Sequence, residues 1–148
     1  IAEYSYPAGY YDLVVSNLAL HYLADLDDIY RKVFSTLRPG GVFLFNIEHP
    51  VFTAGVREDW VRDAEGRPVC WPVDNYYYPG ERTTLFLGQE VKKQHHTLTQ
   101  ILMGLIRCGF VLEAVEEAMP DPSMLDLPGM ADEMRRPMML LGKARKPV

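Results

Sequence analysis

The sequence lacks most of the short motifs that would indicate a reaction. Its eleven glycines never occur as G-x-G, so it has neither a dinucleotide fingerprint nor a phosphate-cradling loop. A G-x-S-x-G elbow is absent, which disfavours a serine hydrolase. C-x-x-C and H-E-x-x-H are also missing, and with them the common zinc sites. No apolar run approaches the roughly 20 residues that a membrane-spanning helix needs.

Cysteine and positive charge are scarce as well. The only cysteines, Cys70 and Cys108, cannot form a disulfide framework, which predicts a reducing, cytoplasmic setting. We expect Cys108, at a predicted helix end, to lie in the core. A net charge of −5 argues against binding to nucleic acid or to an anionic membrane. The 148 residues, 48% of them hydrophobic, are enough for one compact domain and exclude disorder as the main state.

The first third of the chain has the pattern of a strand–helix–strand unit. The apolar run Leu13-Val14-Val15, followed by the polar pair Ser16-Asn17, is typical of a strand buried on both faces of a parallel sheet. Apolar residues at helical spacing predict a helix over 27–37, which Pro39-Gly40-Gly41 ends. A second buried strand is expected over 42–47. This arrangement is a βαβ unit, whose crossover should be right-handed.

The middle of the chain, 49–94, shows neither helical nor strand periodicity and is predicted to be an insertion on the substrate side. We expect loops there, with a hairpin around 83–91. Loops on a rigid α/β scaffold often carry the specificity of a site. A lid or a dimer surface remains an equally good interpretation.

Regular patterns return after the insertion. Thr97 with Gln100 forms a capping box that begins a helix, and Gly109 ends it. The remaining elements expected are a strand over 110–115, a short helix near 130–135, a last strand over 138–141 and a basic, solvated tail over 143–146. The whole order predicts an α/β sheet covered by helices.

Polar residues gather where the first two strands end, and in open α/β sheets ligands bind beyond the carboxyl ends of the strands. Ser16, Asn17, Leu18 and His21 follow the first strand, and Glu48 and His49 end the second. His21 is a candidate base or donor, although a packed or capping side chain would fit the pattern too. Glu48 and His49 place a carboxylate and an imidazole at a predicted site mouth, where a general base would act, although charged residues are also common at strand ends without a catalytic role.

Two further groups in and beside the insertion are open to more than one interpretation. His95-His96 with His49 and Glu48 could ligate a metal, and a metal-dependent hydrolase would use His49 and His95. Adjacent strand residues face opposite sides, however, which makes a metal shared by His95 and His96 awkward. The triplet Tyr76-Tyr77-Tyr78 is either an aromatic wall for a small organic substrate or surface packing.

Three motifs resemble class I S-adenosylmethionine-dependent methyltransferases, in the small-molecule branch similar to types 11 and 12. The run Tyr11-Asp12-Leu13-Val14-Val15-Ser16-Asn17-Leu18-Ala19-Leu20-His21-Tyr22 resembles that family's fourth strand and the loop after it. Leu37-Arg38-Pro39-Gly40-Gly41 and the strand after it resemble the L-(R/K)-P-G-G turn and the fifth strand. Cys108-Gly109-Phe110 resembles the late (A/C)-G-F turn.

The resemblance implies a Rossmann-like sheet whose last strand is antiparallel, and methyl transfer from S-adenosylmethionine to a small molecule. The family positions a nucleophile against the sulfonium methyl and needs little covalent machinery. By position, the cofactor's methionine portion would contact Ser16, Asn17, Leu18 and His21. Tyr76 and Glu48 would contact substrate, and His49 and His95 would be the candidate catalytic bases.

The family's glycine-rich loop and its ribose-binding acidic residue would lie upstream of Ile1. The resemblance therefore implies that residues 1–148 are the C-terminal part of one methyltransferase domain, holding strands four to seven, which alone binds S-adenosylmethionine weakly or not at all. The alternative is a non-catalytic assembly fragment. In that case the strand at 12–16 would form an exposed edge and pair two copies into a homo-oligomer.

Overall fold

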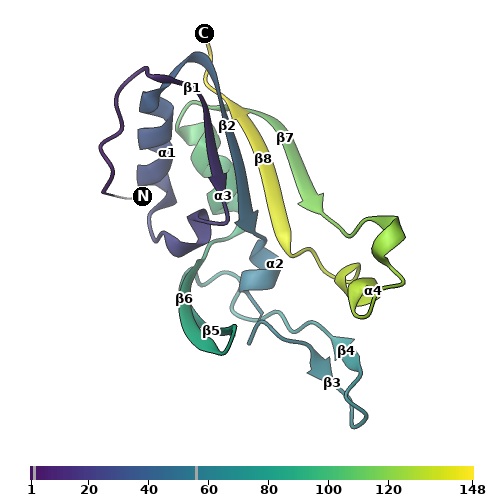
Figure 1. Ribbon diagram of the computed structural model, residues 1–148. Coiled ribbons are helices and arrows are strands. Elements are labelled where there is room, and N and C mark those ends of the chain that lie inside the picture. The colour runs from purple at the N-terminus through teal and green to yellow at the C-terminus, as the bar shows by residue number, and fades with distance from the viewer. Residues whose placement is uncertain (2, 56) are drawn as a thin grey trace.

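Four strands form the main sheet, in the order β1–β2–β8–β7 (Figure 1). The computed structural model describes residues 1, 3–55 and 57–148. The strands are β1 (Tyr11–Asn17), β2 (Leu37–Glu48), β7 (Val111–Ala118) and β8 (Met139–Arg145). β1 and β2 are parallel, whereas β8 is antiparallel to both of its neighbours. The predicted α/β sheet with an antiparallel last strand is therefore confirmed.

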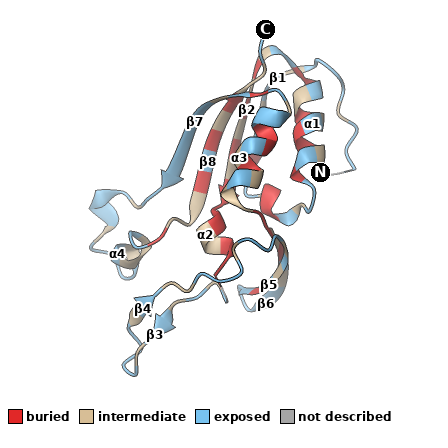
Figure 2. Ribbon diagram, turned by 180° about the vertical axis from the view of Figure 1, so that it is seen from behind, coloured by how far each residue is buried: buried red, intermediate tan, exposed pale blue. Residues whose placement is uncertain are grey.

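Helices α1 (Leu26–Thr36) and α3 (Leu98–Arg107) lie side by side on one face of this sheet, as Figure 2 shows from behind. The Asp25 side chain caps α1 by accepting a hydrogen bond from the Asp28 amide. The predicted capping box at Thr97 is present and begins α3. Local chemistry thus fixes where both helices begin.

The core lies between these two helices and the sheet. Alternate side chains of β2, namely Phe43, Phe45 and Ile47, point toward the helices and are almost fully buried. Gly142 of β8 lies directly beneath the Phe45 ring, so closely that a side chain at this position would overlap the ring. The other buried apolar residues of the core are Leu20, Leu26, Ile29, Tyr30, Val33, Leu37, Ile101, Leu105, Phe110, Leu140 and Ala144. Cys108, predicted to be in the core, is half-buried against it.

The opposite face of the sheet is open among the described residues. Leu13 is 51% exposed and Val15 is 61% exposed. The expectation that this strand is buried on both faces is wrong for this structure, because α1 and α3 both cover the same face. A groove of about 310 Å³ crosses the open face, with Val15, Leu44 and Leu141 among its lining residues.

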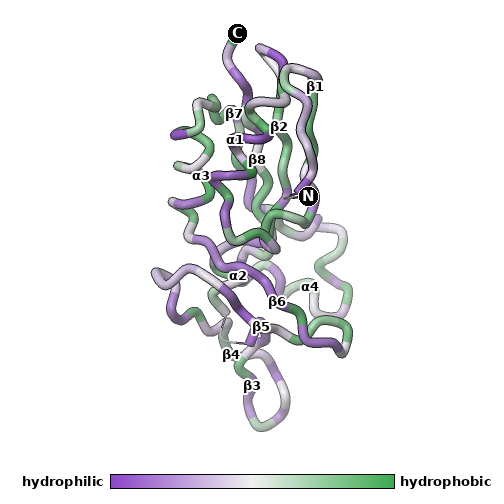
Figure 3. The backbone as a smooth tube through the Cα atoms, turned by 90° about the vertical axis from the view of Figure 1, so that its left-hand side faces the viewer, coloured by the Kyte–Doolittle hydropathy of each residue, from purple (hydrophilic) through white to green (hydrophobic). Residues whose placement is uncertain are grey.

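The segment 49–94 lies at the carboxyl end of β1 and β2 (Figure 1). Its elements are α2 (Pro50–Thr53), β3 (Val61–Arg62), β4 (Pro68–Cys70), β5 (Gly80–Phe86) and β6 (Gln89–His95). β5 and β6 form the predicted hairpin, and its turn has positive φ at Leu87 and Gly88. Figure 3 shows hydrophobic colouring along β1 and β2 and more hydrophilic colouring around β6.

The C-terminal segment returns to the sheet after a 3-10 turn, Pro122–Met124, and the short helix α4 (Met130–Glu133). The prediction of a solvated basic tail over 143–146 is wrong. β8 continues to Arg145, where its basic side chains pair with Glu113, and the Lys146 ammonium donates to main-chain carbonyls of α1 and β2. Leu140, Gly142 and Ala144 alternate along β8 on the face that the helices cover, and their burial explains why the strand extends into the basic residues.

Candidate functional site

The carboxyl ends of β1 and β2 lie together because the two strands are parallel. Asn17 and Asn46 are register partners, and the Asn46 amide donates to the Asn17 side-chain oxygen over 3.0 Å. The next residue, Leu18, has a φ of 53° while its amide donates to the Asn46 carbonyl. A non-glycine residue in this conformation needs support from its surroundings, and the turn after β1 is therefore fixed by β2.

His21 follows in a 3-10 turn, Leu20–Tyr22, and is buried. Its Nδ1 accepts a hydrogen bond from the Glu48 amide at 3.3 Å, and its Nε2 lies 3.9 Å from Glu48 Oε1. Burial, helped by the nearby Lys93 charge, lowers the pKa of His21 to about 4. His21 is therefore neutral at pH 7 with its proton on Nε2. The structure brings together His21 and Glu48, two of the predicted site residues.

Glu48 belongs to a buried ionic cluster that also contains Glu58 and Lys93. The Lys93 ammonium lies 2.7 Å from Glu48 Oε1 and 3.0 Å from Glu58 Oε2. All three side chains are at least nine-tenths buried. Burial acts to lower the pKa of Lys93, but its hydrogen bonds to both carboxylates outweigh this and hold the pKa above its usual value.

The sequence did not single out Glu58 or Lys93. Lys93 shares one face of β6 with Val91 and His95, and this spacing of two residues is the signal that could have placed it inward. Glu58 lies in an irregular loop, and nothing in its neighbourhood in the sequence marks it.

His49 caps α2 and points away from Glu48. Its Nδ1 accepts from the Val51 amide at 3.0 Å, and its Nε2 lies 2.9 Å from Glu117 Oε1 on β7. Burial lowers the pKa of His49, while the Glu117 charge acts in the opposite direction. The result is an imidazole–carboxylate pair at the sheet edge, one member buried and the other exposed.

His95 and Tyr76 fasten the β5–β6 hairpin to its surroundings. The Nε2 of His95 donates to the Tyr76 carbonyl at 2.8 Å, so its Nδ1 accepts from the Thr53 hydroxyl at 2.7 Å. Burial lowers the pKa of His95, which keeps the ring neutral. The Tyr76 hydroxyl accepts from the Leu98 amide at the start of α3. Both ring nitrogens of His95 are thus occupied, and its role as a base stays a prediction.

His96 lies apart from His95, as the alternation of a strand requires, and its Nε2 donates to the Leu23 carbonyl. Over residues 1, 3–55 and 57–148 there is no group of three or more His, Cys, Asp or Glu side chains that could hold a metal ion. The neighbours of Tyr76 in the triplet, Tyr77 and Tyr78, are exposed.

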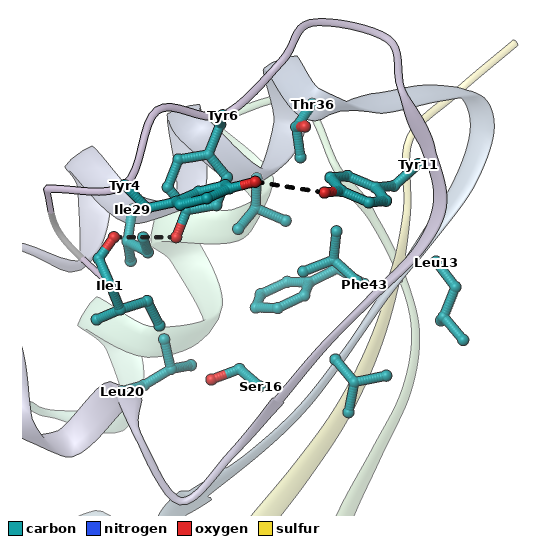
Figure 4. A pocket seen from close by; sticks show the side chains of 13 residues that line it. Ile1, Tyr4, Tyr6, Tyr11, Leu13, Ser16, Leu20, Ile29, Thr36 and Phe43 are labelled. Carbon is teal, nitrogen blue, oxygen red and sulfur yellow. Dashed lines mark hydrogen bonds between the residues drawn. The ribbon is translucent and has the colours of Figure 1, made fainter.

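A cavity of about 280 Å³ lies beside β1, lined mainly by apolar and tyrosine side chains (Figure 4). Tyr4 and Tyr11 approach each other across it, with their hydroxyl oxygens 3.5 Å apart. Ser16 and Leu20 line the same cavity. The Ser16 hydroxyl oxygen is buried and has no hydrogen-bond partner in the described part of the chain. A buried polar atom without a partner needs an explanation, and a polar group of a bound ligand is one.

The sequence and the structure are both similar to those of known methyltransferases. A family model described as a methyltransferase domain matches residues 1–45. The structure superposes with a TM-score of 0.94 on a proposed S-adenosylmethionine dependent methyltransferase from Listeria monocytogenes, 46% identical over 99% of this chain and 66% of that one. An S-adenosylmethionine dependent methyltransferase from Mesorhizobium loti gives a TM-score of 0.87 and 43% identity, over 97% of this chain and 66% of that one.

The resemblance seen in the sequence is therefore confirmed: the chain has the class I fold of S-adenosylmethionine-dependent methyltransferases. A curated relative, an uncharacterized protein of Haemophilus influenzae, is 28% identical over 95% of this chain and 56% of its own length. The chain thus spans between about half and two thirds of the relatives it matches. No helix in the described segments is long and apolar enough to cross a membrane.

Proposed function

We propose that the protein transfers a methyl group from S-adenosylmethionine to a small-molecule acceptor. The observation that carries the proposal is the buried Ser16 hydroxyl at the carboxyl end of β1, which has no partner among the described residues. The sequence is also 46% identical to that of a proposed S-adenosylmethionine dependent methyltransferase with the same fold. The net charge of −5 favours a small acceptor over a nucleic acid.

The residues after β1 fit the methionine end of the cofactor. Ser16 supplies the free hydroxyl, Asn17 and Leu18 are held in place by β2, and His21 is a neutral imidazole whose Nδ1 accepts from the Glu48 amide. S-adenosylmethionine supplies an electrophilic methyl group on a sulfonium. No G-x-G loop occurs in the sequence, so we propose that the loop which cradles the cofactor comes from outside residues 1–148.

The acceptor would lie under the segment 49–94, near Glu48 and Tyr76. An acceptor that carries a proton needs a base, and His49 and His95 are the candidates. Both ring nitrogens of each imidazole are engaged, those of His49 by the Val51 amide and the Glu117 carboxylate and those of His95 by Thr53 and Tyr76. Either ring would have to release the hydrogen bond to its accepting nitrogen before it could take the proton.

Calorimetry of the full-length gene product with S-adenosylmethionine tests this proposal. We expect micromolar binding, and we expect Ser16→Ala to weaken it by about tenfold, since a buried hydrogen bond to a charged group contributes about 1.5 kcal/mol. Ser123→Ala, at an exposed serine, is the matched control. Binding that is absent from the full-length protein would refute the proposal.

The contribution of residues 1–148 is tested in the same experiment. We expect this segment alone to bind S-adenosylmethionine weakly or not at all, because it lacks a glycine-rich loop. Micromolar binding by the segment would show that these residues suffice for the cofactor.

A second candidate function is assembly of two copies through β1. Among the described residues β1 pairs only with β2, and Leu13 and Val15 on it are exposed. Unpaired apolar edges tend to pair with another chain. Light scattering of the segment should then give a dimer that Val15→Lys converts to a monomer. A monomer before the substitution would exclude this candidate.

A further inference from the structure

The buried cluster around Lys93 joins four segments that are distant in sequence. His21 comes from the turn after β1, Glu48 from the end of β2, Glu58 from the loop that follows α2, and Lys93 from β6. The cluster therefore lies where the sheet edge meets the segment 49–94. This position is next to the turn that we assign to the cofactor.

The charges in this cluster do not balance. Glu48 and Glu58 carry two negative charges, and Lys93 is the only cation in the described part of the chain that bonds to either of them. His21 does not compensate, because its Nδ1 is an acceptor and the ring is neutral. The ammonium also lies 5.7 Å from the centre of the Phe52 ring and 5.8 Å from the centre of the Phe86 ring. One buried negative charge is left over, and an unpaired buried charge is costly.

The two carboxylates also have unused oxygens. Lys93 takes Oε1 of Glu48 and Oε2 of Glu58. Glu48 Oε2 and Glu58 Oε1 are buried and accept no hydrogen bond in the described residues. Buried acceptors in native proteins are normally satisfied, so each of the two oxygens needs a donor that residues 1, 3–55 and 57–148 do not provide. A group with several N–H donors and a positive charge would meet both requirements.

We propose that Glu48 and Glu58 bind a positively charged amino group of the acceptor, which makes the acceptor a molecule that bears an amine. This group is held as an ammonium, so it is separate from the atom that takes the methyl group, which needs a lone pair. The inference rests on the proposed function and deepens it by naming the substrate class. Glu48 Oε2 and Glu58 Oε1 each accept an N–H of that group, while Lys93 holds the two carboxylates together. The flanking rings of Phe52 and Phe86 favour an apolar or aromatic body on the amine.

The test compares benzylamine with benzyl alcohol, a neutral molecule of almost the same shape, by calorimetric titration of the full-length gene product. We expect benzylamine to bind and the alcohol to bind at least about tenfold more weakly, since hydrogen bonds to charged groups carry this selectivity. Equal affinities, or no binding of benzylamine, would overturn the inference. This comparison uses the unaltered protein, so it does not depend on how a variant folds.

Variants locate the binding site. Glu48→Gln and Glu58→Gln keep the shape of the side chain, and each should weaken benzylamine binding about tenfold or more. Glu81→Gln is the matched control, because Glu81 is a half-exposed carboxylate that pairs with Lys92 on the hairpin surface. Affinities unchanged by both cluster variants would place the amine elsewhere and refute the inference.

Failure of this inference is distinguishable from failure of the proposed function. Binding of S-adenosylmethionine without selectivity for the amine leaves the methyltransferase proposal intact and removes the amine subsite. Selective amine binding without binding of S-adenosylmethionine leaves the amine subsite intact and removes the methyltransferase proposal.

Discussion

The helix-covered sheet and the segment 49–94 are stabilised in different ways. Between α1, α3 and the sheet, the buried side chains are almost all apolar, with Phe43 and Leu140 as examples. In and next to 49–94, several of the buried side chains are polar or charged, among them Thr53, Lys93 and His95. Apolar burial is non-directional and insensitive to pH, whereas buried polar groups depend on specific partners. The stability of the segment 49–94 and its surroundings therefore depends on the charge of single side chains, which is a property expected of a binding site.

The largest effect should come from the core. Phe43→Ala removes a fully buried ring that contacts Tyr30, Phe45 and Phe110, and it should lower the free energy of unfolding by about 4 kcal/mol. Urea unfolding measures the loss. Phe86→Ala, at a half-exposed ring on the hairpin, is the control and should cost less than about 1 kcal/mol. Equal losses would remove the contrast between the regions.

Breaking the ionic cluster should have the next largest effect. Lys93→Met leaves Glu48 and Glu58 buried without a cation and should lower the free energy of unfolding by about 3 kcal/mol. Adding Glu48→Gln and Glu58→Gln to this variant should restore most of that stability, because the repulsion is removed. No such rescue exists for the core variant. If the triple variant is as unstable as Lys93→Met, the contribution of Lys93 is packing and not charge.

The sequence could predict the first region because its signals are local. The apolar runs of β1 and β2, the helical spacing over α1 and the capping box at Thr97 each lie within a few residues of the element they define. The exceptions are informative. Leu13 and Val15 belong to an apolar run that is typical of a strand buried on both faces. Their burial depends on a layer that lies over them, and α1 and α3 both cover the other face.

The site was predicted only where it follows a strand end. His21 and Glu48 were found because parallel strands bring their carboxyl ends together. Lys93 and Glu58 were missed because their partners are distant along the chain: Lys93 lies 45 residues from Glu48 and 35 from Glu58. Helical and strand periodicity reflect neighbours within a few residues and carry no information on contacts between residues this far apart in the sequence. The positions of His49 and His95 were identified, but not their partners Glu117 and Thr53, for the same reason.

Acid should weaken the second region before the first. The pKa of His21 is lowered from 6.5 to about 4 in the folded state by burial and by Lys93, so the unfolded state binds protons first. The stability due to neutral His21 is complete above pH 6.5 and is lost as the pH falls toward 4. We expect a loss of about 2 kcal/mol, measured by urea unfolding across this range.

His21→Asn is the control for this acid effect, since its amide oxygen can still accept from the Glu48 amide but does not titrate. The variant should lose part of the pH dependence between pH 6.5 and 4. The remainder belongs to His49, His95 and His96, whose pKa values are also lowered by burial. A pH profile identical to that of the unaltered protein would show that His21 contributes nothing.

The smallest effect lies at the junction of the two regions, where α3 begins. Its first amides are satisfied by the Thr97 cap from within the helix and by the Tyr76 hydroxyl from the segment 49–94. Thr97→Ala should lower the free energy of unfolding by about 1 kcal/mol, and Tyr76→Phe by about 0.5 kcal/mol, as measured by urea unfolding. Because the two side chains satisfy different amides, the double variant should show additive losses. Non-additive losses would mean that the cap and the hairpin contact form one unit, so that the junction belongs to the site as much as to the helix.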